Sequence, residues 1–250
     1  MSAPSLALNN VTKNFGPTEI IRGVSIKIAA GERHALIGPN GAGKTTLFNL
    51  ISGRFPITSG EIWLDTTRLD GLPPHRINRL GLSRSFQITS IFHRLSVYEN
   101  IRCSLLWNRG YRYSFWRALG QQRALNEETQ RLLQELNLAE RGDVPAGLLS
   151  YAEQRALEIG MTIAGGASAI LLDEPTAGMS HSETEYAVAL IRRVTQGKTL
   201  VMVEHDMRVV FDLADTITVL VYGRVIASGP PAEIRADRAV QEAYLGAIAA

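Results

Sequence analysis

The residues best suited to chemistry form a glycine-rich loop near the start of the chain, GPNGAGKTT, which matches G-x-x-x-x-G-K-[ST]. Backbone N–H groups can approach phosphate oxygens at Gly38, Gly41 and Gly43, because no Cβ atom obstructs them or disfavours the required dihedral angles. We expect the Lys44 ammonium to reach β and γ phosphates and the Thr45 hydroxyl to ligate Mg²⁺. The predicted phosphate-binding residues are Gly38, Pro39, Asn40, Gly41, Ala42, Gly43, Lys44, Thr45 and Thr46. The alternative is a glycine-rich turn that binds nothing.

An acidic pair ends the apolar run AILLDEP. Asp173 suits a ligand of Mg²⁺, directly or through water, because a hard cation on a polyphosphate prefers carboxylate and water oxygens. Glu174 stands one residue further along, where a carboxylate can orient and deprotonate an attacking water. Without other motifs, such a pair is more often a helix N-cap or a solvated turn.

A histidine ends a second apolar run, LVMVEH. A neutral imidazole at His205 can donate and accept a hydrogen bond, so it can contact a γ-phosphate or the attacking water. A lone histidine is more often structural. The other histidines show no metal-ligand spacing with the cysteine or with one another; they are His34, His75, His93 and His181.

The elements around these residues predict how they are positioned. RHALIG precedes the loop as a strand, and TTLFNLIS follows it with apolar residues at helical spacing. SAILLDEP and TLVMVEH have the pattern of buried parallel strands with chemistry at their carboxyl ends. LALNNVTKNFG and GVSIKIAAGE indicate further strands near the N-terminus, and TITVLVYGRVIASG predicts a hairpin that turns at Tyr222 and Gly223.

A change of pattern in the middle of the chain indicates an insertion. Strand-like alternation disappears there, and EETQRLLQELNL has the spacing of an amphipathic helix. We therefore predict a core from residues 1–95 and 164–225, an inserted helical subdomain at residues 96–163, and a helical tail at residues 226–250.

Composition narrows the classes of partner and compartment. The chain has 250 residues and a net charge of +2, which gives no reason to expect nucleic acid. Its single cysteine, Cys103, cannot form an internal disulfide. We see no secretory signal and no apolar run of the roughly 18 to 20 residues that cross a bilayer. We expect a cytoplasmic protein.

Taken in order, these motifs resemble the ATP-binding cassette family over essentially the whole chain. The resemblance implies an α/β fold with a P-loop NTPase (RecA-like) core, an antiparallel β subdomain and an inserted helical subdomain. It implies ATP and Mg²⁺ as cofactors. Asp173 and Glu174 then look like the second Walker motif with its catalytic base, and His205 like the switch histidine.

Other roles rest on the resemblance alone. Phe15 occupies the place of an aromatic that stacks on adenine, and Gln87 that of a glutamine that senses Mg²⁺ and water. LSYAEQR stands where the family carries its LSGGQ signature. In this family two subunits dimerise head to tail, so that Ser150 and the backbone of Ala152 would complete the phosphate site of the partner.

The chain departs from the family pattern in several places. Tyr151 and Ala152 replace the two signature glycines, and the alanine methyl can clash or bias the backbone, so rate and dimer affinity are open. Ser180 stands where the dimer-contact loop, TAGMS, commonly has an acidic residue. Phe15 lacks a phenol hydroxyl, which predicts modest base selectivity.

Within the family, the chain is most similar to importer ATPases for branched-chain and hydrophobic amino acids. The strings SVYENI, LSYAEQR, EPTAGMS, VEHDM and EAYLG carry this likeness. It implies a second ATP-binding subunit in a homodimer or heterodimer, transmembrane permease subunits, a substrate-binding protein and no nucleic acid. The chain would then lie in the cytoplasm, peripheral to the inner face of the cell membrane.

Several alternatives stay open at this point. ATPases of urea, amide and aromatic-acid importers and of lipopolysaccharide exporters are similar, whereas a cassette ATPase of DNA maintenance would need coiled coils that the short insert lacks. A non-catalytic ATP sensor is disfavoured by the complete set of motif residues. The stretch CSLLWNRGYRYSFWRAL, residues 103–119, suits either internal packing or a lipid or partner interface.

Overall fold

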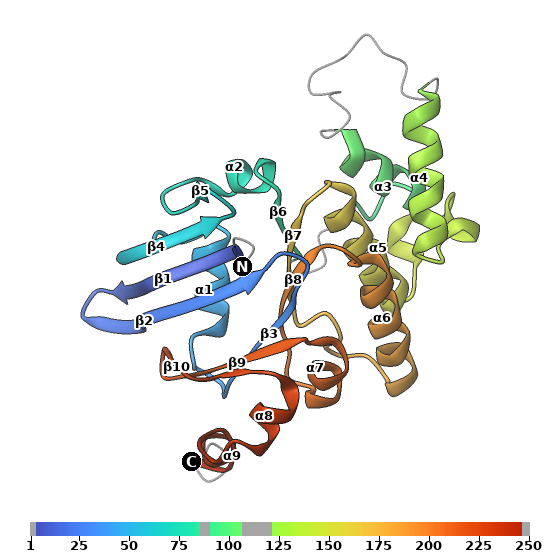
Figure 1. Cartoon of the computed structure of the whole chain (residues 1–250). Coiled ribbons are helices and arrows are strands. Elements are labelled where there is room, and N and C mark those ends of the chain that lie inside the picture. The colour runs from blue at the N-terminus through green and yellow to red at the C-terminus, as the bar shows by residue number, and fades with distance from the viewer. Residues whose placement is uncertain (1–3, 86–90, 107–121, 247–250) are drawn as a thin grey trace. The chain divides into compact units, whose positions relative to one another are not determined.

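The computed structural model describes residues 4–85, 91–106 and 122–246 (Figure 1). The chain divides into two compact units. The sheet unit contains residues 1–84, 168–174 and 197–250, and the helical unit contains residues 85–167 and 175–196.

A six-stranded sheet provides the frame of the sheet unit. Its order is β10-β9-β3-β8-β7-β6, and all neighbours are parallel except β9 and β10. The strands are β3 (Arg33–Ile37), β6 (Leu82–Arg84), β7 (Ala169–Asp173), β8 (Thr199–Val203), β9 (Thr216–Val221) and β10 (Arg224–Gly229). Every residue of β7 and β8 is buried, which explains why their sequences are continuously apolar.

A second, antiparallel sheet has the order β2-β1-β4-β5. It contains β1 (Pro4–Phe15), β2 (Thr18–Ala29), β4 (Ser59–Leu64) and β5 (Thr67–Arg68). Helix α1 (Lys44–Ile51) shares one buried apolar cluster with strands of both sheets, and its Phe48 is fully buried there. Helix α1, which follows the glycine loop, is therefore packed against both sheets (Figure 1).

The remaining helices of the sheet unit are short. They are α2 (Pro74–Arg79), α7 (Met207–Leu213), α8 (Pro231–Ala236) and α9 (Arg238–Gly246). The predicted hairpin is confirmed, because β9 and β10 pair across a turn in which Tyr222 and Gly223 both have positive φ. The C-terminal segment from residue 226 therefore begins within a strand and continues as helices.

The helical unit contains α3 (Val97–Leu106), α4 (Arg123–Glu135), α5 (Tyr151–Ala164) and α6 (His181–Val194), with short 3₁₀ turns at Ala139–Arg141 and Ala146–Leu148. The amphipathic pattern of EETQRLLQELNL is confirmed in α4, which buries Leu132 and Leu133; earlier in the same helix, Leu125 is buried as well. Residues 175–196, which the sequence places with the core, group with this unit because α6 packs against α5.

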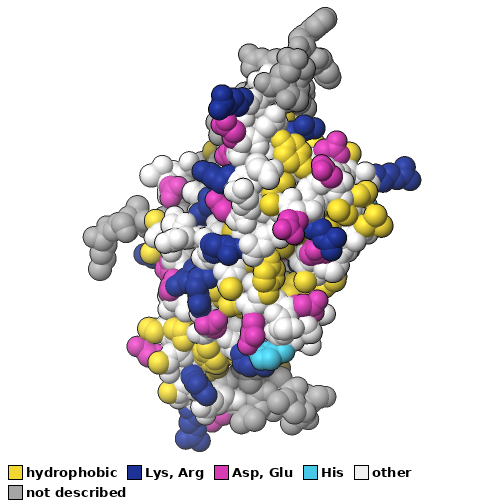
Figure 2. Space-filling view, turned by 90° about the vertical axis from the view of Figure 1, so that its right-hand side faces the viewer, with side chains coloured by type: hydrophobic (Ala, Val, Ile, Leu, Met, Phe, Trp, Pro, Cys, Tyr) yellow, Lys and Arg dark blue, Asp and Glu magenta, His cyan; other side chains and the backbone are white. Residues whose placement is uncertain are grey.

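Two further features of the described residues are the distribution of surface charge and the length of the helices. Figure 2 shows a face on which basic and acidic side chains are interspersed among the described residues. Within the same described ranges, no helix has the length and apolar character that a membrane span requires.

We predict that Phe48→Ala lowers the free energy of unfolding by about 3 to 5 kcal/mol, because it leaves a cavity between the two sheets. Urea denaturation followed by circular dichroism measures this change. The matched control is Phe92→Ala, since Phe92 is 55% exposed and its loss should cost below about 0.5 kcal/mol. Equal effects of the two substitutions would contradict the assigned core.

Candidate active site

The glycine loop joins the buried end of β3 to the start of α1, as the sequence predicts. Gly38 has φ 153°, and a Cβ atom there would lie 2.0 Å from the Leu220 carbonyl oxygen of β9. Gly43 has φ 103°, and its Cβ atom would lie 2.8 Å from the Ile21 side chain. Gly38 therefore requires glycine for both its backbone conformation and the space, and Gly43 requires it for its left-handed backbone.

The Lys44 side chain folds back over this loop and is 6% exposed. Its ammonium donates hydrogen bonds to the carbonyl oxygens of Gly38 at 2.6 Å and Pro39 at 3.0 Å. Burial lowers the pKa of Lys44, while the charges of Glu174 and Asp173 oppose that shift. The loop thus holds a buried cation beside the N-terminus of α1, an arrangement suited to binding a polyanion.

A cavity of about 430 Å³ opens over the loop. It brings together residues from β1, β2, the glycine loop and the ends of β7 and β8. The lining residues are Phe15, Ile20, Asn40, Gly41, Ala42, Gly43, Lys44, Thr45, Thr46, Glu174 and His205. Most of the site residues predicted in the sheet unit therefore share one cavity.

Glu174 and His205 contact each other directly. The distance from His205 Nε2 to Glu174 Oε1 is 2.8 Å. Glu174 has φ 49°, which is uncommon for a residue with a side chain, and its N–H donates to the Val203 carbonyl oxygen at 2.9 Å. The two groups that could handle a proton are thus held as a pair at the carboxyl ends of adjacent parallel strands.

Asp173 is held by a buried arginine that the sequence analysis missed. Arg84 Nη2 donates to Asp173 Oδ2 at 2.8 Å, and these side chains are 5% and 2% exposed. Arg84 Nη1 also donates to Asn49 Oδ1 at 2.8 Å and Ser52 Oγ at 2.9 Å on the C-terminal side of α1. The available sign was an arginine within SRSFQ, three residues before Gln87, since a buried guanidinium needs acceptors.

The Asp173 carboxylate fits a role beside Mg²⁺. Its Oδ1 atom is buried and has no hydrogen-bond partner within the described part of the chain. A carboxylate with one oxygen anchored and the other unpaired can accept from metal-bound water or contact the cation. Among the described residues no group of three His, Cys, Asp or Glu side chains could hold a metal alone, so phosphate and Thr45 oxygens would have to contribute.

The signature segment lies in the helical unit, at the start of α5. Ser150 is the N-cap of α5: its hydroxyl accepts from the Glu153 N–H at 3.3 Å, and Glu153 accepts from the Ser150 N–H at 2.8 Å. Ala152 lies in the first turn and is partly exposed. The segment therefore presents an exposed, capped helix start.

Tyr151 joins this helix start to the TAGMS loop within the same unit. Its hydroxyl donates to the Ala177 carbonyl oxygen at 2.9 Å, and the Arg155 guanidinium lies 5.7 Å from its ring centroid. Ser180, at the end of that loop, forms a capping box with Glu183 at the start of α6. The sequence marked Tyr151 as a departure but did not predict this contact.

Two predicted features lie outside the described residues. They are Gln87 and residues 107–119 of the aromatic and basic stretch.

Comparison with known proteins gives matches along the whole chain. Residues 21–177 match the family model "ABC transporter", and residues 224–250 match "Branched-chain amino acid ATP-binding cassette transporter". The chain is 36% identical to the high-affinity branched-chain amino acid transport ATP-binding protein BraF of Pseudomonas aeruginosa, over 98% of this chain and 99% of BraF. It is 34% identical to LivG of Escherichia coli, a protein of the same description, over 98% and 99% of the two chains.

The fold is similar to solved structures as well. An ATP-binding cassette of an ABC transporter in its ADP conformation matches with a TM-score of 0.84 and 25% identity, over 98% of this chain and all of that one. The glycine loop, the acidic strand end and the full-length likeness agree. The chain therefore belongs to the ABC transporter family, as one of its ATP-binding subunits.

Proposed function

We propose that this chain hydrolyses ATP to power the import of branched-chain or other hydrophobic amino acids. The main support for this class of transported substrate is the similarity to BraF and LivG, which spans nearly all of each chain. The match of residues 224–250 to a branched-chain amino acid transporter model supports it independently of the catalytic motifs.

The site supports a division of labour among its residues. The glycine loop and Lys44 bind the β and γ phosphates, and Thr45 and Asp173 hold Mg²⁺, which neutralises charge on the phosphates when it is bound. Glu174 accepts the proton of the attacking water as water adds to the γ-phosphorus and ADP leaves. His205, which is 2.8 Å from Glu174, orients that carboxylate and can reach the γ-phosphate.

The partners belong to the same proposal. A second ATP-binding subunit, identical or related, supplies Ser150 and the start of its α5 to the opposite phosphate site, where unpaired N–H groups suit an anion. Closing and opening of this dimer drives permease subunits, and a substrate-binding protein delivers the cargo. The chain then lies in the cytoplasm against the inner face of the membrane.

Uptake measurements test the cargo. A strain without this gene should lose most uptake of radiolabelled leucine, and the intact gene should restore it while Glu174→Gln should not. Urea and benzoate uptake serve as parallel assays. Loss of urea or benzoate uptake with normal leucine uptake would contradict the amino acid assignment and favour a related importer.

We predict that Lys44→Ala weakens MgATP binding roughly 10- to 100-fold, since a hydrogen bond to a charged group contributes about 1.5 to 3 kcal/mol. Isothermal titration calorimetry gives the dissociation constants. Lys27→Ala is the control, because Lys27 is an exposed lysine of β2 in the same unit. Unchanged affinity in Lys44→Ala would reject the assigned phosphate site.

We predict that Glu174→Gln binds MgATP, fails to hydrolyse it and accumulates as a dimer. Glutamine keeps the shape and a hydrogen bond to His205, but it cannot take the proton of water. Adding Ser150→Arg should prevent dimerisation without removing ATP binding to the monomer. Analytical ultracentrifugation over a concentration series, with and without MgATP, distinguishes the outcomes. A nucleotide-dependent dimer that survives Ser150→Arg would rule out the shared site.

A further inference from the structure

Phe15 presents a partly exposed aromatic ring in the lining of the phosphate cavity. It is the last residue of β1, it is 44% exposed, and it lines the same cavity as Lys44 and Thr45. An exposed ring so close to a phosphate loop is suited to stacking on a base, provided that the ring stays in one orientation.

Two side chains contact this ring. The Lys13 ammonium lies over it, 4.8 Å from the centroid. The Phe55 ring meets it edge to face, with 5.5 Å between centroids and 85° between planes. Both arrangements are attractive because the face of an aromatic ring is negative and its edge is positive. Phe15 stays 44% exposed beside these two contacts, so part of its surface is left for a planar ligand.

Lys13 and Phe55 are themselves fixed by the segment that follows α1, residues 52–58. Lys13 is 8% exposed, and its ammonium donates to the Pro56 carbonyl oxygen at 2.7 Å. The Thr58 N–H donates to the Thr12 carbonyl oxygen at 2.9 Å. These bonds tie the end of β1 to segment 52–58.

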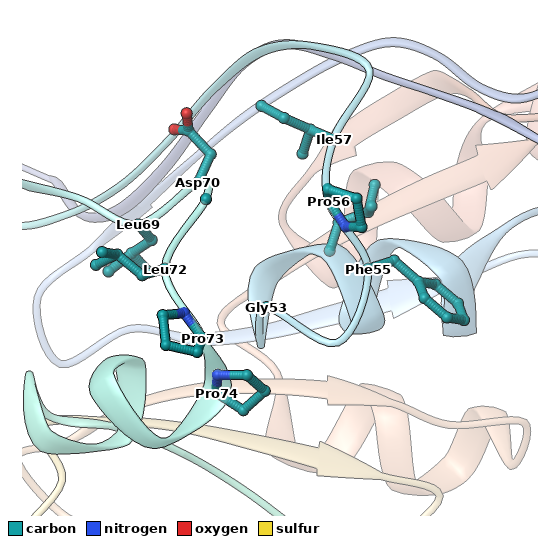
Figure 3. Close-up of a pocket in the computed structure, with 11 residues that line it drawn as sticks. Gly53, Phe55, Pro56, Ile57, Leu69, Asp70, Leu72, Pro73 and Pro74 are labelled. Carbon is teal, nitrogen blue, oxygen red and sulfur yellow. The ribbon is translucent and has the colours of Figure 1, made fainter.

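The same segment is tied to the phosphate-loop helix. The N–H of Phe55 donates to the Asn49 carbonyl oxygen of α1 at 3.2 Å. On another side, the segment borders a cavity of about 240 Å³, whose opposite wall contains Leu72, Pro73 and Pro74 (Figure 3). At Gly53 the segment also packs closely against Leu72 and Pro74, because a Cβ atom there would lie 2.6 Å from the Leu72 carbonyl oxygen. The hydrogen bonds to β1 and α1 thus add to this packing in placing Phe55.

We infer that Lys13 and Phe55 are positioning residues for base recognition, which hold the Phe15 ring at a fixed place relative to the phosphate loop. They connect the ring through segment 52–58 to α1, the helix whose first residue is Lys44. The end of β1, segment 52–58 and α1 are thus joined by hydrogen bonds, and together they set the distance between the base and the phosphates. The inference rests on the proposed binding of ATP in this cavity.

Binding of ATP and of inorganic tripolyphosphate, measured by calorimetry, tests the inference. Phe15→Ala should weaken ATP binding roughly 5- to 100-fold and leave tripolyphosphate binding unchanged, because stacking involves only the base. Phe55→Ala and Lys13→Met should each weaken ATP binding about 3- to 10-fold, again without changing tripolyphosphate binding. Lys13→Arg and Phe55→Tyr should retain ATP affinity close to that of the unchanged protein, since they keep the cation and the second aromatic ring.

A double variant separates positioning from a general structural effect. If Lys13 and Phe55 act through Phe15, the variant Phe15→Ala with Phe55→Ala should bind ATP no more weakly than Phe15→Ala alone. Additive losses, or equal losses for ATP and tripolyphosphate, would overturn the inference. If Phe15→Ala alone leaves ATP affinity unchanged, the base does not stack on Phe15, and the inference falls while the Lys44 phosphate site can still stand.

Discussion

Close approach of backbone to backbone at the glycine loop is the constraint on which the site depends. Phosphate oxygens can be bound by N–H groups only where no side chain intervenes, and Gly38 lies so near Leu220 of β9 that a Cβ atom would come within 2.0 Å of its carbonyl oxygen. Strand β9 therefore restricts position 38 of the loop to glycine. The parallel sheet positions β3, β7 and β8 so that Lys44, Asp173 and Glu174 meet at one edge.

A second constraint is the burial of charge close to that edge. Asp173 lies almost wholly out of water, and the Arg84 guanidinium holds only one of its two oxygens. Burial lowers the pKa of Arg84, and its bond to Asp173 opposes that shift. Because Arg84 also bonds Asn49 and Ser52, the carboxylate is tied to the same helix that begins at the phosphate loop. Asp173 and the phosphate loop are thus both connected to α1.

The sequence predicted those parts of the site that depend on local geometry. A glycine loop between a strand and a helix, an acidic pair after a buried strand and the hairpin at Tyr222 are short-range patterns, and the fold has all of them. It could not predict contacts between distant side chains, such as Arg84 with Asp173, since these depend on which strands become neighbours. Residues 175–196 were placed with the core because they lie between the predicted strands SAILLDEP and TLVMVEH, and the sequence does not show with which helices they pack.

The departure at Tyr151 illustrates the same limit in the helical unit. From the sequence, replacing a small residue in the signature indicates only added bulk and a stiffer backbone. In the structure the phenol hydroxyl donates to the Ala177 carbonyl oxygen of the TAGMS loop, and the ring lies beside Gly178, where a Cβ atom would make an ordinary contact at 3.8 Å. The tyrosine thus adds a tie between the α5 start and this loop that glycine, without a side chain, could not form. The larger side chain at position 151 therefore makes a specific contact with the loop. Beside it, Ser150 still caps α5, and the start of this helix stays exposed.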